Sequence, residues 1–434
     1  MKPFITPSDI LPALKGHQQL LVALSGGLDS TVLLHLLCQL RNDSGITLRA
    51  LYVHHGISRY ADSWLSHCQQ LCAGWQVPFL SRKVQLTESG KGTEAEAREK
   101  RYQALAQAMT LGEALVTAQH QNDQCETLLL ALKRGSGPAG LAAMPGILPF
   151  NHSVILRPLL GFSRQQLEAY ARHHGLSWIE DDSNTDDSYD RNFLRLRILP
   201  LLHARWPYFA RSVARSAELC GEQESLLDEM LAEQLQMIIG PAGELKLPAL
   251  KTMSEARRAA LLRRWFAGLG ATMPARAALQ RLWHEVVMSR EDATPRLRFG
   301  DHEVRRYQDA LWWVPVRSSQ RDTVIGWCQP FDPLTLPDGL GVLRLANCGV
   351  AVRRPAEGEA VSVRFQASGN IHIVGRQHGR TLKKLWQELG IAPWQRDTTP
   401  LLFYGEQLIA APGVFVTREG QGEAGNCWYL DWLR

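Results

Sequence analysis

One stretch near the start of the chain restricts its fold more than any other. Residues 20–24 are apolar, and Ser25-Gly26-Gly27-Leu28-Asp29-Ser30 follows directly. The apolar run predicts a buried strand, and the residues from Asp29 onward predict a helix with leucines on its inner side. Two adjacent glycines allow a tight turn between the two elements and a close approach to the backbone. This order of elements predicts an α/β fold.

The turn also has the chemistry of a phosphate-binding loop. N–H groups at a helix N-terminus attract anions, and Ser25, Ser30 and Thr31 add hydroxyl donors. The loop is not of the Walker type, because no Gly-Lys-[Ser/Thr] follows it. The alternative is a turn that only redirects the chain, with Ser25 or Asp29 as a helix cap.

Alternating strands and helices continue through the first half of the chain. Strands are predicted at 48–53, 77–80, 115–118 and 154–160, and helices at 62–75, 93–109 and 123–133. Repeated βα units predict a doubly wound parallel sheet with helices on both faces. Ligands bind such sheets at the carboxyl ends of the strands. We therefore expect the 25–30 loop, His54-His55 and the 118–120 turn on one rim.

The rest of the chain predicts further domains. We expect an α/β catalytic domain at 1–216, a mainly helical basic domain at 217–315, a proline- and glycine-rich linker at 316–348 and a small α+β domain at 349–434. Residues 251–306 contain 12 Lys and Arg against 6 Asp and Glu, and residues 352–418 contain 9 against 5. Such surfaces suit a polyanion, although solvated arginine-rich helices explain the counts equally well.

The composition predicts a globular protein of the cytoplasm. Of the 434 residues, 45% are hydrophobic and 21% are charged, and no apolar run reaches the length of a membrane span. No signal-peptide pattern is expected at the N-terminus. The eight cysteines form no C-x-x-C pair, so reduced thiols without a metal are expected. The oligomeric state stays open, a homodimer included.

Two further stretches carry candidate functional groups. In His120-Gln-Asn-Asp123-Gln-Cys-Glu126, the two acids lie one helical turn apart and could bind an ammonium group or accept its proton. The alternative is a helix cap with acids in its first turn. In residues 178–197, acids precede Arg191 and Arg195, which share a helix face. These arginines suit either phosphates or a local salt-bridged corner.

Two blocks near the C-terminus, 372–386 and 394–405, complete a set of motifs that resembles a known family. The 25–30 loop is similar to the SGGxDS loop of the PP-loop ATP pyrophosphatase superfamily. The remaining blocks are 54–56, 94–102, 117–127, 134–137 and 178–195. Together, over almost the whole chain, they resemble the bacterial tRNA(Ile)-lysidine synthetase family.

The resemblance implies an ATP-dependent ligation of L-lysine to a tRNA. The ε-amino group of lysine would be joined to carbon 2 of the wobble cytidine in the isoleucine tRNA with a CAU anticodon. The product, lysidine, changes codon reading from AUG to AUA and charging from methionine to isoleucine. Adenylation of the cytosine O2 with loss of pyrophosphate would precede displacement of AMP. A free lysine amine has a pKa of about 10.4, so nearby carboxylates would help to bind and deprotonate it.

The resemblance also implies roles for individual residues. The ATP-binding loop would comprise Ser25, Gly26, Gly27, Leu28, Asp29 and Ser30. The expected catalytic acids are Asp29, Asp123 and Glu126, and Asp29 would also bind Mg²⁺. The residues expected near lysine, cytidine or phosphate are His120, Arg98 and Arg195. The candidate tRNA-binding residues are Arg376, Arg380, Lys383, Lys384 and Arg396.

One position departs from the family pattern. The family often reads His-x-Asp-Asp where this chain has His120-Gln-Asn122-Asp123. An amide replaces a hydrogen bond but not a charge. We infer that Asp123 carries the essential carboxylate.

Three rival interpretations are less well supported by the sequence. A tRNA thiolase of the same superfamily would carry paired cysteines or an iron–sulfur site. An amidotransferase-type synthetase would need a nucleophilic cysteine near the N-terminus, where position 2 is lysine. A tRNA-binding protein with an inactive nucleotide site is disfavoured by the intact 25–30 loop.

Overall fold

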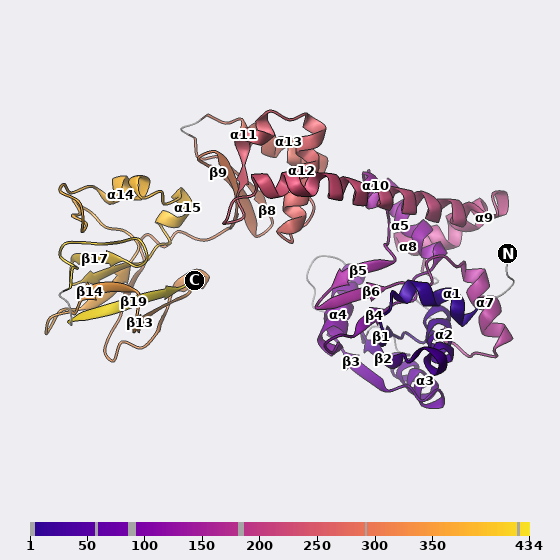
Figure 1. The fold of residues 1–434 in the computed structure, drawn as a ribbon. Helices are drawn as coiled ribbons and strands as arrows, with labels where there is room; N and C mark the ends of the chain where they lie inside the picture. Colours follow the sequence, from indigo (N-terminus) through magenta and orange to yellow (C-terminus); the bar gives the residue numbers. More distant parts are fainter. Residues whose placement is uncertain (1–4, 57–59, 86–92, 181–185, 291–292, 423–425) are drawn as a thin grey trace. The chain divides into compact units, whose positions relative to one another are not determined.

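The chain forms two compact units, Met1–Met230 and Leu231–Arg434 (Figure 1). The computed structural model describes residues 5–56, 60–85, 93–180, 186–290, 293–422 and 426–434, without the side chains of residues 42–43 and 93–95. None of the helices in these ranges is both long enough and apolar enough to cross a membrane.

The first unit is built on one six-stranded sheet. Its strands are β1 (Gln19–Ala23), β2 (Thr47–His54), β3 (Phe79–Lys83), β4 (Ala114–Val116), β5 (Ile147–Phe150) and β6 (Ser153–Leu156). Their order is β3-β2-β1-β4-β6-β5, and every neighbouring pair is parallel except β5 and β6. The chain runs outward from β1 to β3 and returns to place β4 on the other side of β1. This reversal makes the carboxyl ends of β1 and β4 the switch point where such sheets bind ligands.

Helices cover both faces of the sheet, as predicted. Leu20 and Val22 face α2 (Leu28–Ser44), α3 (Ala61–Gly74) and α7 (Arg164–His173) in one core. Leu21 points the other way, into a smaller core with α4 (Thr93–Ala108). Side chains of a strand alternate between faces, so this apolar run is buried on both sides. The strand predicted at 154–160 is present as β6 and ends at Leu156. Its antiparallel partner β5 was not predicted, because residues 147–149 carry no apolar–polar alternation.

A third core of the first unit lies around α5 (Gln121–Lys133), the helix that follows β4. Cys125 and Leu128 of α5 pack there with residues of α9 (Leu199–Arg205) and α10 (Phe209–Ile238). The other short helices of this unit are α1 (Pro7–Ile10), η1 (Leu11–Leu14), α6 (Pro138–Leu141), α8 (Asp190–Phe193) and η3 (Leu194–Ile198). The packing around α5 fixes the helix that carries the candidate acids.

The second unit begins with a mainly helical part. Its elements are β7 (Leu245–Lys246), α11 (Leu247–Lys251), α12 (Glu255–Gly268), α13 (Arg276–Arg281), η4 (Leu282–Val287), β8 (Arg296–Phe299), β9 (His302–Tyr307) and β10 (Ala310–Pro315). Trp265 and Phe266 are almost fully buried between these helices and the β7-β10-β9-β8 sheet.

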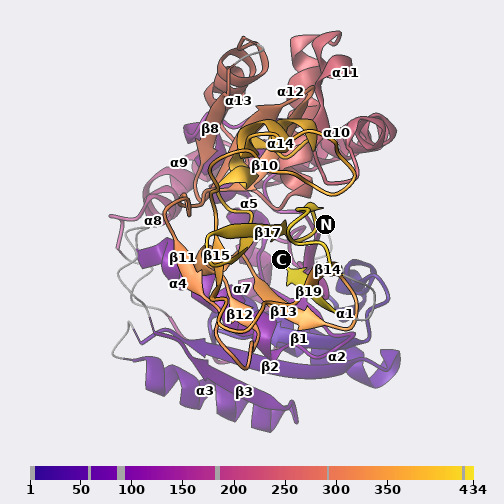
Figure 2. The same cartoon turned by 90° about the vertical axis from the view of Figure 1, so that its left-hand side faces the viewer.

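The remainder of the second unit contains two antiparallel sheets, visible in Figure 2. One has the order β11-β15-β16-β17-β18 and the other β12-β13-β19-β14. The elements are β11 (Val324–Gly326), β12 (Leu334–Thr335), η5 (Pro337–Gly339), β13 (Val342–Ala346), β14 (Val350–Arg353), β15 (Val361–Arg364), α14 (Leu382–Glu388), α15 (Pro393–Arg396), β16 (Leu401–Tyr404), β17 (Gln407–Ala411), β18 (Phe415–Val416) and β19 (Cys427–Leu433).

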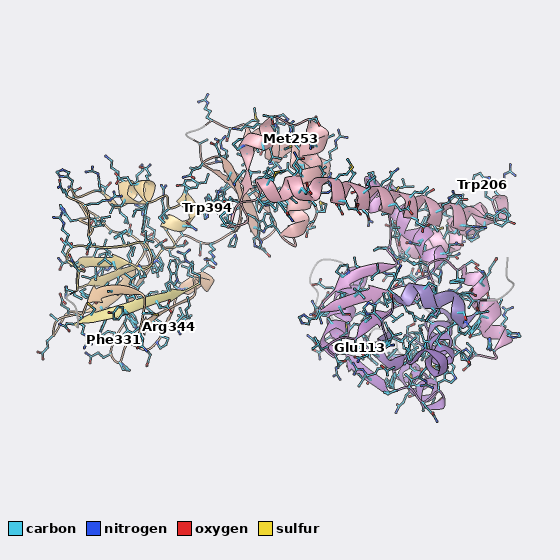
Figure 3. All side chains as sticks on the ribbon, in the orientation of Figure 1. Glu113, Trp206, Met253, Phe331, Arg344 and Trp394 are labelled. Carbon is cyan, nitrogen blue, oxygen red and sulfur yellow. The ribbon has the colours of Figure 1, made fainter. Side chains whose placement is uncertain are left out.

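The expected linker at 316–348 is not devoid of regular structure. It contains β11, β12 and β13, which pair into these two sheets. Phe331, which is labelled in Figure 3, packs edge to face against Trp428, with ring centroids 4.6 Å apart. The prolines and glycines mark turns between short strands, and strands of two to five residues leave too weak a pattern to recognise.

Candidate functional site

The loop between β1 and α2 has the conformation that its glycines permit. Gly26 has φ +82°, in the left-handed region, and Gly27 caps α2 in an extended conformation. The hydroxyls of Ser25 and Ser30 lie 3.0 Å apart, and the Ser25 N–H donates to Ser30 Oγ at 3.2 Å. The N–H groups in the first turn of α2 have no acceptor within the helix. The loop therefore offers backbone and hydroxyl donors at a helix N-terminus, the chemistry of a phosphate site.

A segment distant in sequence closes one side of the loop. Ile179 donates its N–H to the Gly26 carbonyl at 2.9 Å and pairs with Gly27 in a parallel bridge. A Cβ on Gly26 would lie 2.8 Å from Ile179 Cδ1 and 2.9 Å from Cys68 Sγ. Nothing in the sequence indicated this contact. The acids expected just after it, Asp181-Asp182, lie outside the described residues.

His120 brings the loop acid and an α5 acid together. Its Nε2 lies 3.4 Å from Asp29 Oδ2 and 3.5 Å from Asp123 Oδ2. As the N-cap of α5, His120 accepts the Asn122 N–H on Nδ1 at 3.2 Å and donates its own N–H to Asp123 Oδ2 at 2.9 Å. Because Nδ1 accepts, the neutral ring carries its proton on Nε2, between the two carboxylates. The capping pattern and the candidate site thus share the same residues.

The other acid of α5 is held by arginines. Glu126 is fully buried, and Arg195 binds both of its oxygens, with Nε–Oε1 2.8 Å and Nη2–Oε2 3.0 Å. Arg195 Nη2 also lies 3.4 Å from Asp123 Oδ1, and Arg191 Nε lies 3.9 Å from Glu126 Oε2. The stretch 178–197 therefore supplies arginines to the acids of α5. The side chains of Asp29 and Asp123 stay partly accessible, at 27% and 14%.

Burial and charge act against each other on the pKa values of this cluster. Burial opposes ionisation of Asp29, but the hydrogen bond and charge of His120, with the charges of Arg164 and Arg195, hold its pKa below the ordinary value. Burial also disfavours the His120 cation, but Asp29 and Asp123 raise the pKa of that ring. Burial raises the pKa of Glu126 in spite of Arg195. The cluster therefore contains two carboxyl groups with opposite pKa shifts. The pKa of Asp29 is lowered and that of the buried Glu126 is raised.

Asn122, the departure from the family pattern, makes a structural hydrogen bond. Its Oδ1 accepts the N–H of Arg164, the first residue of α7, at 3.1 Å. Arg164 Nη1 in turn lies 3.7 Å from Asp29 Oδ2. An amide oxygen accepts this hydrogen bond as a carboxylate oxygen would, without adding a charge.

A cavity of about 340 Å³ opens beside the loop within the first unit. Its lining includes Ser25, Gly27, Asp29, Ser30, His55, Arg98, Arg101, Tyr102, Thr117, Gln119, Asp123 and Arg191. Arg98, expected at the site, has its guanidinium 5.2 Å from the centre of the Tyr102 ring. Arg101 and Arg164 were missed. The signal available for Arg101 was its position three residues after Arg98, on the same face of α4.

His54 and His55 reach the same rim, but only His55 lines the cavity. Burial, with the charge of Arg101 nearby, lowers the pKa of His55 to about 4, so the ring is neutral at physiological pH. His54 instead lies 3.2 Å from Asp62 and accepts the Gly56 N–H.

The candidate tRNA-binding residues all lie in the second unit. Arg376 and Arg380 share one partner, Glu388, with Arg380 Nε 3.4 Å from Oε1. Lys383-Lys384 are exposed on α14. Arg396 is half-buried and donates to a backbone carbonyl at 3.1 Å. Of these candidates, the two lysines are therefore the most accessible to a tRNA phosphate.

All eight cysteines are free thiols. Within the part of the chain that the structure describes, no three His, Cys, Asp or Glu side chains are grouped so that they could hold a metal ion.

A glycine loop at the switch point of a doubly wound sheet, beside a buried acid cluster, defines a nucleotide-binding enzyme of the PP-loop class. A family model described as a PP-loop domain matches residues 3–202, and the models of the TilS substrate binding domain and the TilS substrate C-terminal domain match residues 245–312 and 361–432. Proteins named tRNA(Ile)-lysidine synthase are similar over nearly the whole chain. The chain belongs to the tRNA(Ile)-lysidine synthase family.

The similarity to these relatives is high. The protein from Shigella flexneri is 58% identical over 96% of this chain and 96% of its own, and that from Escherichia coli O157:H7 is 57% identical over 96% and 97%. Among solved structures, a U34-tRNA thiolase from Methanococcus maripaludis covers 50% of this chain and 77% of its own, at 16% identity. Its TM-score of 0.43 is too low to add to the family assignment.

Proposed function

We propose that the chain joins L-lysine to carbon 2 of the wobble cytidine in the isoleucine tRNA with a CAU anticodon, at the expense of ATP. The observation that carries this is the phosphate-type loop together with Asp29 and Asp123 in one cavity of the first unit, with His120 within 3.5 Å of both acids. Family membership supplies the substrates, and the cavity supplies the donors and acids that the two steps require.

In the first step, the cytosine O2 attacks the α-phosphorus of ATP, a bond from O2 to phosphorus forms, and pyrophosphate leaves. The donors of the 25–30 loop stabilise the charge on the phosphates. Arg98 and Arg101, on the α4 wall of the cavity, supply positive charge for the same phosphates or the adenylated base.

In the second step, the ε-nitrogen of lysine attacks carbon 2, and AMP leaves with the former O2. The amine must first lose its proton. Asp29 and Asp123 are the accessible carboxylates, so they bind the ammonium group and one of them accepts its proton. Glu126 is buried and bound by Arg195, so we propose that it acts by positioning this arginine between the acids.

Mg²⁺ fits one feature of the site. Asp29 Oδ1 is buried and has no hydrogen-bond partner among the described residues, and Mg²⁺ is usually held by one or two carboxylates together with substrate phosphates. We propose that Asp29 holds this ion, which would neutralise phosphate charge when bound.

The tRNA is proposed to bind the helical and C-terminal parts of the second unit. Recognition of RNA relies on phosphate contacts and on bases that leave the stack. Lys383-Lys384 are the best placed of the candidates for phosphate contacts, because both are exposed. Arg376 and Arg380 would have to exchange Glu388 for phosphate oxygens.

The decisive experiment measures incorporation of labelled lysine with ATP and Mg²⁺. We expect incorporation into the transcript of the isoleucine tRNA with the CAU anticodon, with AMP and pyrophosphate as products, and none into methionine tRNA transcripts. Asp29→Asn should abolish incorporation and retain tRNA affinity. Absence of incorporation by the unaltered chain would refute the proposed function, and loss of tRNA affinity in the variant would refute the role of Asp29.

A further inference from the structure

A second cavity, of about 540 Å³, lies in the helical part of the second unit, between α12 and the α13–η4 segment. We call it the α12–α13 groove. Its floor is apolar, with Leu262 and Leu279 both almost fully buried. Its other lining residues are Glu255, Ala256, Arg258, Ala259, Arg263, Arg276, Gln280, Trp283 and His284. The volume is in the range of about 300–1,000 Å³ that small-ligand sites span.

The groove contains a stacked arginine and tryptophan. The guanidinium carbon of Arg258 lies 3.9 Å from the centre of the Trp283 ring, and both side chains are half-buried. Trp283 packs against the core of this part of the unit. One face of the planar guanidinium is therefore covered by the indole ring, which fixes its orientation.

Trp283 is presented by an irregular turn. It lies in η4, a π-helical turn at Leu282–Val287 that continues directly from α13. Such turns widen a helix at the cost of less favourable hydrogen bonds and frequently occur at functional sites. Here the wide turn places the indole ring at the groove while Leu282 and Val286 stay in the core.

The charge of the groove favours an anion. Its lining has three arginines against a single acid, Glu255. Among the described residues, no carboxylate lies within ion-pair distance of Arg258 or Arg276, and Arg263 donates only to the Pro274 carbonyl. Unpaired arginines above an apolar floor suit a ligand that combines a flat apolar ring with a phosphate.

We propose that the α12–α13 groove binds one unpaired nucleotide of the tRNA, with its base stacked on the Arg258–Trp283 pair and its phosphate at Arg263 or Arg276. Bases that leave an RNA helix commonly stack on guanidinium planes and aromatic rings. An acidic peptide would satisfy the arginines but leave the planar stack without a partner. This inference rests on the proposed function for its tRNA, and the nucleotide is not the wobble cytidine, which reacts in the cavity of the first unit.

The test compares neighbouring arginines of α12 in the full chain. Arg258→Ala and Arg258→Lys both remove the planar guanidinium, and the lysine variant keeps the positive charge. Arg257→Ala is the matched control, because Arg257 is exposed, bonds Gln234 and does not line the groove. The measurements are the Kd of the unmodified transcript at fixed salt and KM for tRNA, ATP and lysine. Thermal unfolding of each variant verifies that it is folded.

We expect both Arg258 variants to weaken tRNA binding about tenfold, with a matching rise in KM for tRNA, and Arg257→Ala to change it less than twofold. Trp283→Phe should keep most of the affinity, because it retains a ring. Equal losses of affinity in Arg258→Ala and Arg257→Ala, or full affinity in Arg258→Lys, would overturn the proposal. Lysine incorporation by the unaltered chain is scored separately, so failure of the groove and failure of the proposed function are distinguishable.

Discussion

At the scale of single residues, Asp29 combines two features. Its pKa is lowered although the side chain is largely buried, and its Oδ1 has no hydrogen-bond partner among the described residues. His120, the N-cap of α5, lowers this pKa through its hydrogen bond and charge, and the guanidinium of Arg164 adds a positive charge 3.7 Å from Asp29 Oδ2. The acid cluster is therefore held together at a helix N-cap, where hydrogen bonds and charge offset the cost of burial.

Gly26→Ala should weaken ATP binding and lower the free energy of unfolding by about 1–3 kcal/mol, because its φ is positive and a Cβ would contact Ile179 and Cys68. KM for ATP and urea unfolding measure the two effects. Gly16→Ala is the control, since Gly16 has φ +80° with open space around it. It should lose stability without a change in KM. Equal KM values in both variants would contradict a role for the close approach to Ile179.

Glu126→Gln and Arg195→Ala should each lower kcat/KM at least tenfold, and the double variant should be little worse than either. The reason is that Glu126 acts through Arg195 in our proposal, so the second change removes nothing further. The measurement is a double-mutant cycle on lysine incorporation. Effects that multiply would instead assign Glu126 an independent contact with the substrate.

At the scale of secondary-structure elements, strand ends and helix starts position the chemistry. The first turns of α2 and α5 meet at the carboxyl ends of β1 and β4, and Asn122 connects α5 to the start of α7. At the opposite end of the sheet, an ion pair connects β2 to the start of β4. Arg49 of β2 donates from Nε and Nη2 to the two carboxylate oxygens of Glu113, at 2.8 and 2.6 Å (Glu113 is labelled in Figure 3).

Glu113→Gln should cost about 3 kcal/mol in the free energy of unfolding at neutral pH, because the Arg49 guanidinium loses its carboxylate and keeps only its hydrogen bond to the Ala108 carbonyl. Burial opposes ionisation of Glu113, but Arg49 outweighs it and lowers the pKa. A carboxyl group whose pKa is lowered by folding stabilises the fold at pH values above its unfolded-state pKa of about 4.3. This stabilisation is lost as the pH falls through the folded-state pKa. Urea unfolding should show a constant difference in the free energy of unfolding between variant and parent from pH 5.5 to 8. This difference should shrink below about pH 4. A gap independent of pH would contradict this.

Lys383→Ala with Lys384→Ala on α14 should weaken tRNA binding and reduce the slope of log Kd against log salt by about one for each phosphate that the variant no longer binds. Binding titrations at several salt concentrations measure both. Arg344→Ala is a control in the same unit, because Arg344 is paired with Asp431 across β13 and β19. An unchanged affinity in the variant that lacks both lysines would show that Lys383 and Lys384 are solvated surface residues without a role in tRNA binding.

At the scale of the whole molecule, two units with separate cores share one long helix. Ala210 and Val213 of α10 belong to a core of the first unit, whereas Leu231 and Ile238 belong to a core of the second. The cavity beside the 25–30 loop draws its lining from the first unit alone.

Calorimetry should therefore resolve two unfolding transitions. A non-hydrolysable ATP analogue with Mg²⁺ should raise the midpoint temperature of only one of them. At 100 times Kd the stabilisation should be about 2.7 kcal/mol. Arg344→Ala identifies the second unit, since it should lower only the transition that the nucleotide leaves unchanged. A nucleotide-induced shift of both transitions would show that the units unfold together.

Much of the fold and part of the site could be predicted from the sequence. The βα alternation and the apolar strands identified the parallel sheet, and the placement of Asp29, His120 and Asp123 on one rim follows from its topology. The short strands of residues 316–348 were missed, because two to five residues carry too little periodicity. The contacts of Ile179 with Gly26 and of Arg195 with Glu126 join residues far apart in the chain. No local pattern encodes such contacts.

The sequence by itself determined the 25–30 loop, because a strand, two glycines and a helix cap are local features. It also determined membership of the family, because the motifs extend over nearly the whole chain. Only the tertiary structure decided which acids stay accessible, which is bound by an arginine and buried, and that Asn122 accepts a hydrogen bond from the first residue of α7. The physical reason is that burial and ion pairing arise between elements brought together by packing, and they set the pKa and the role of each carboxylate.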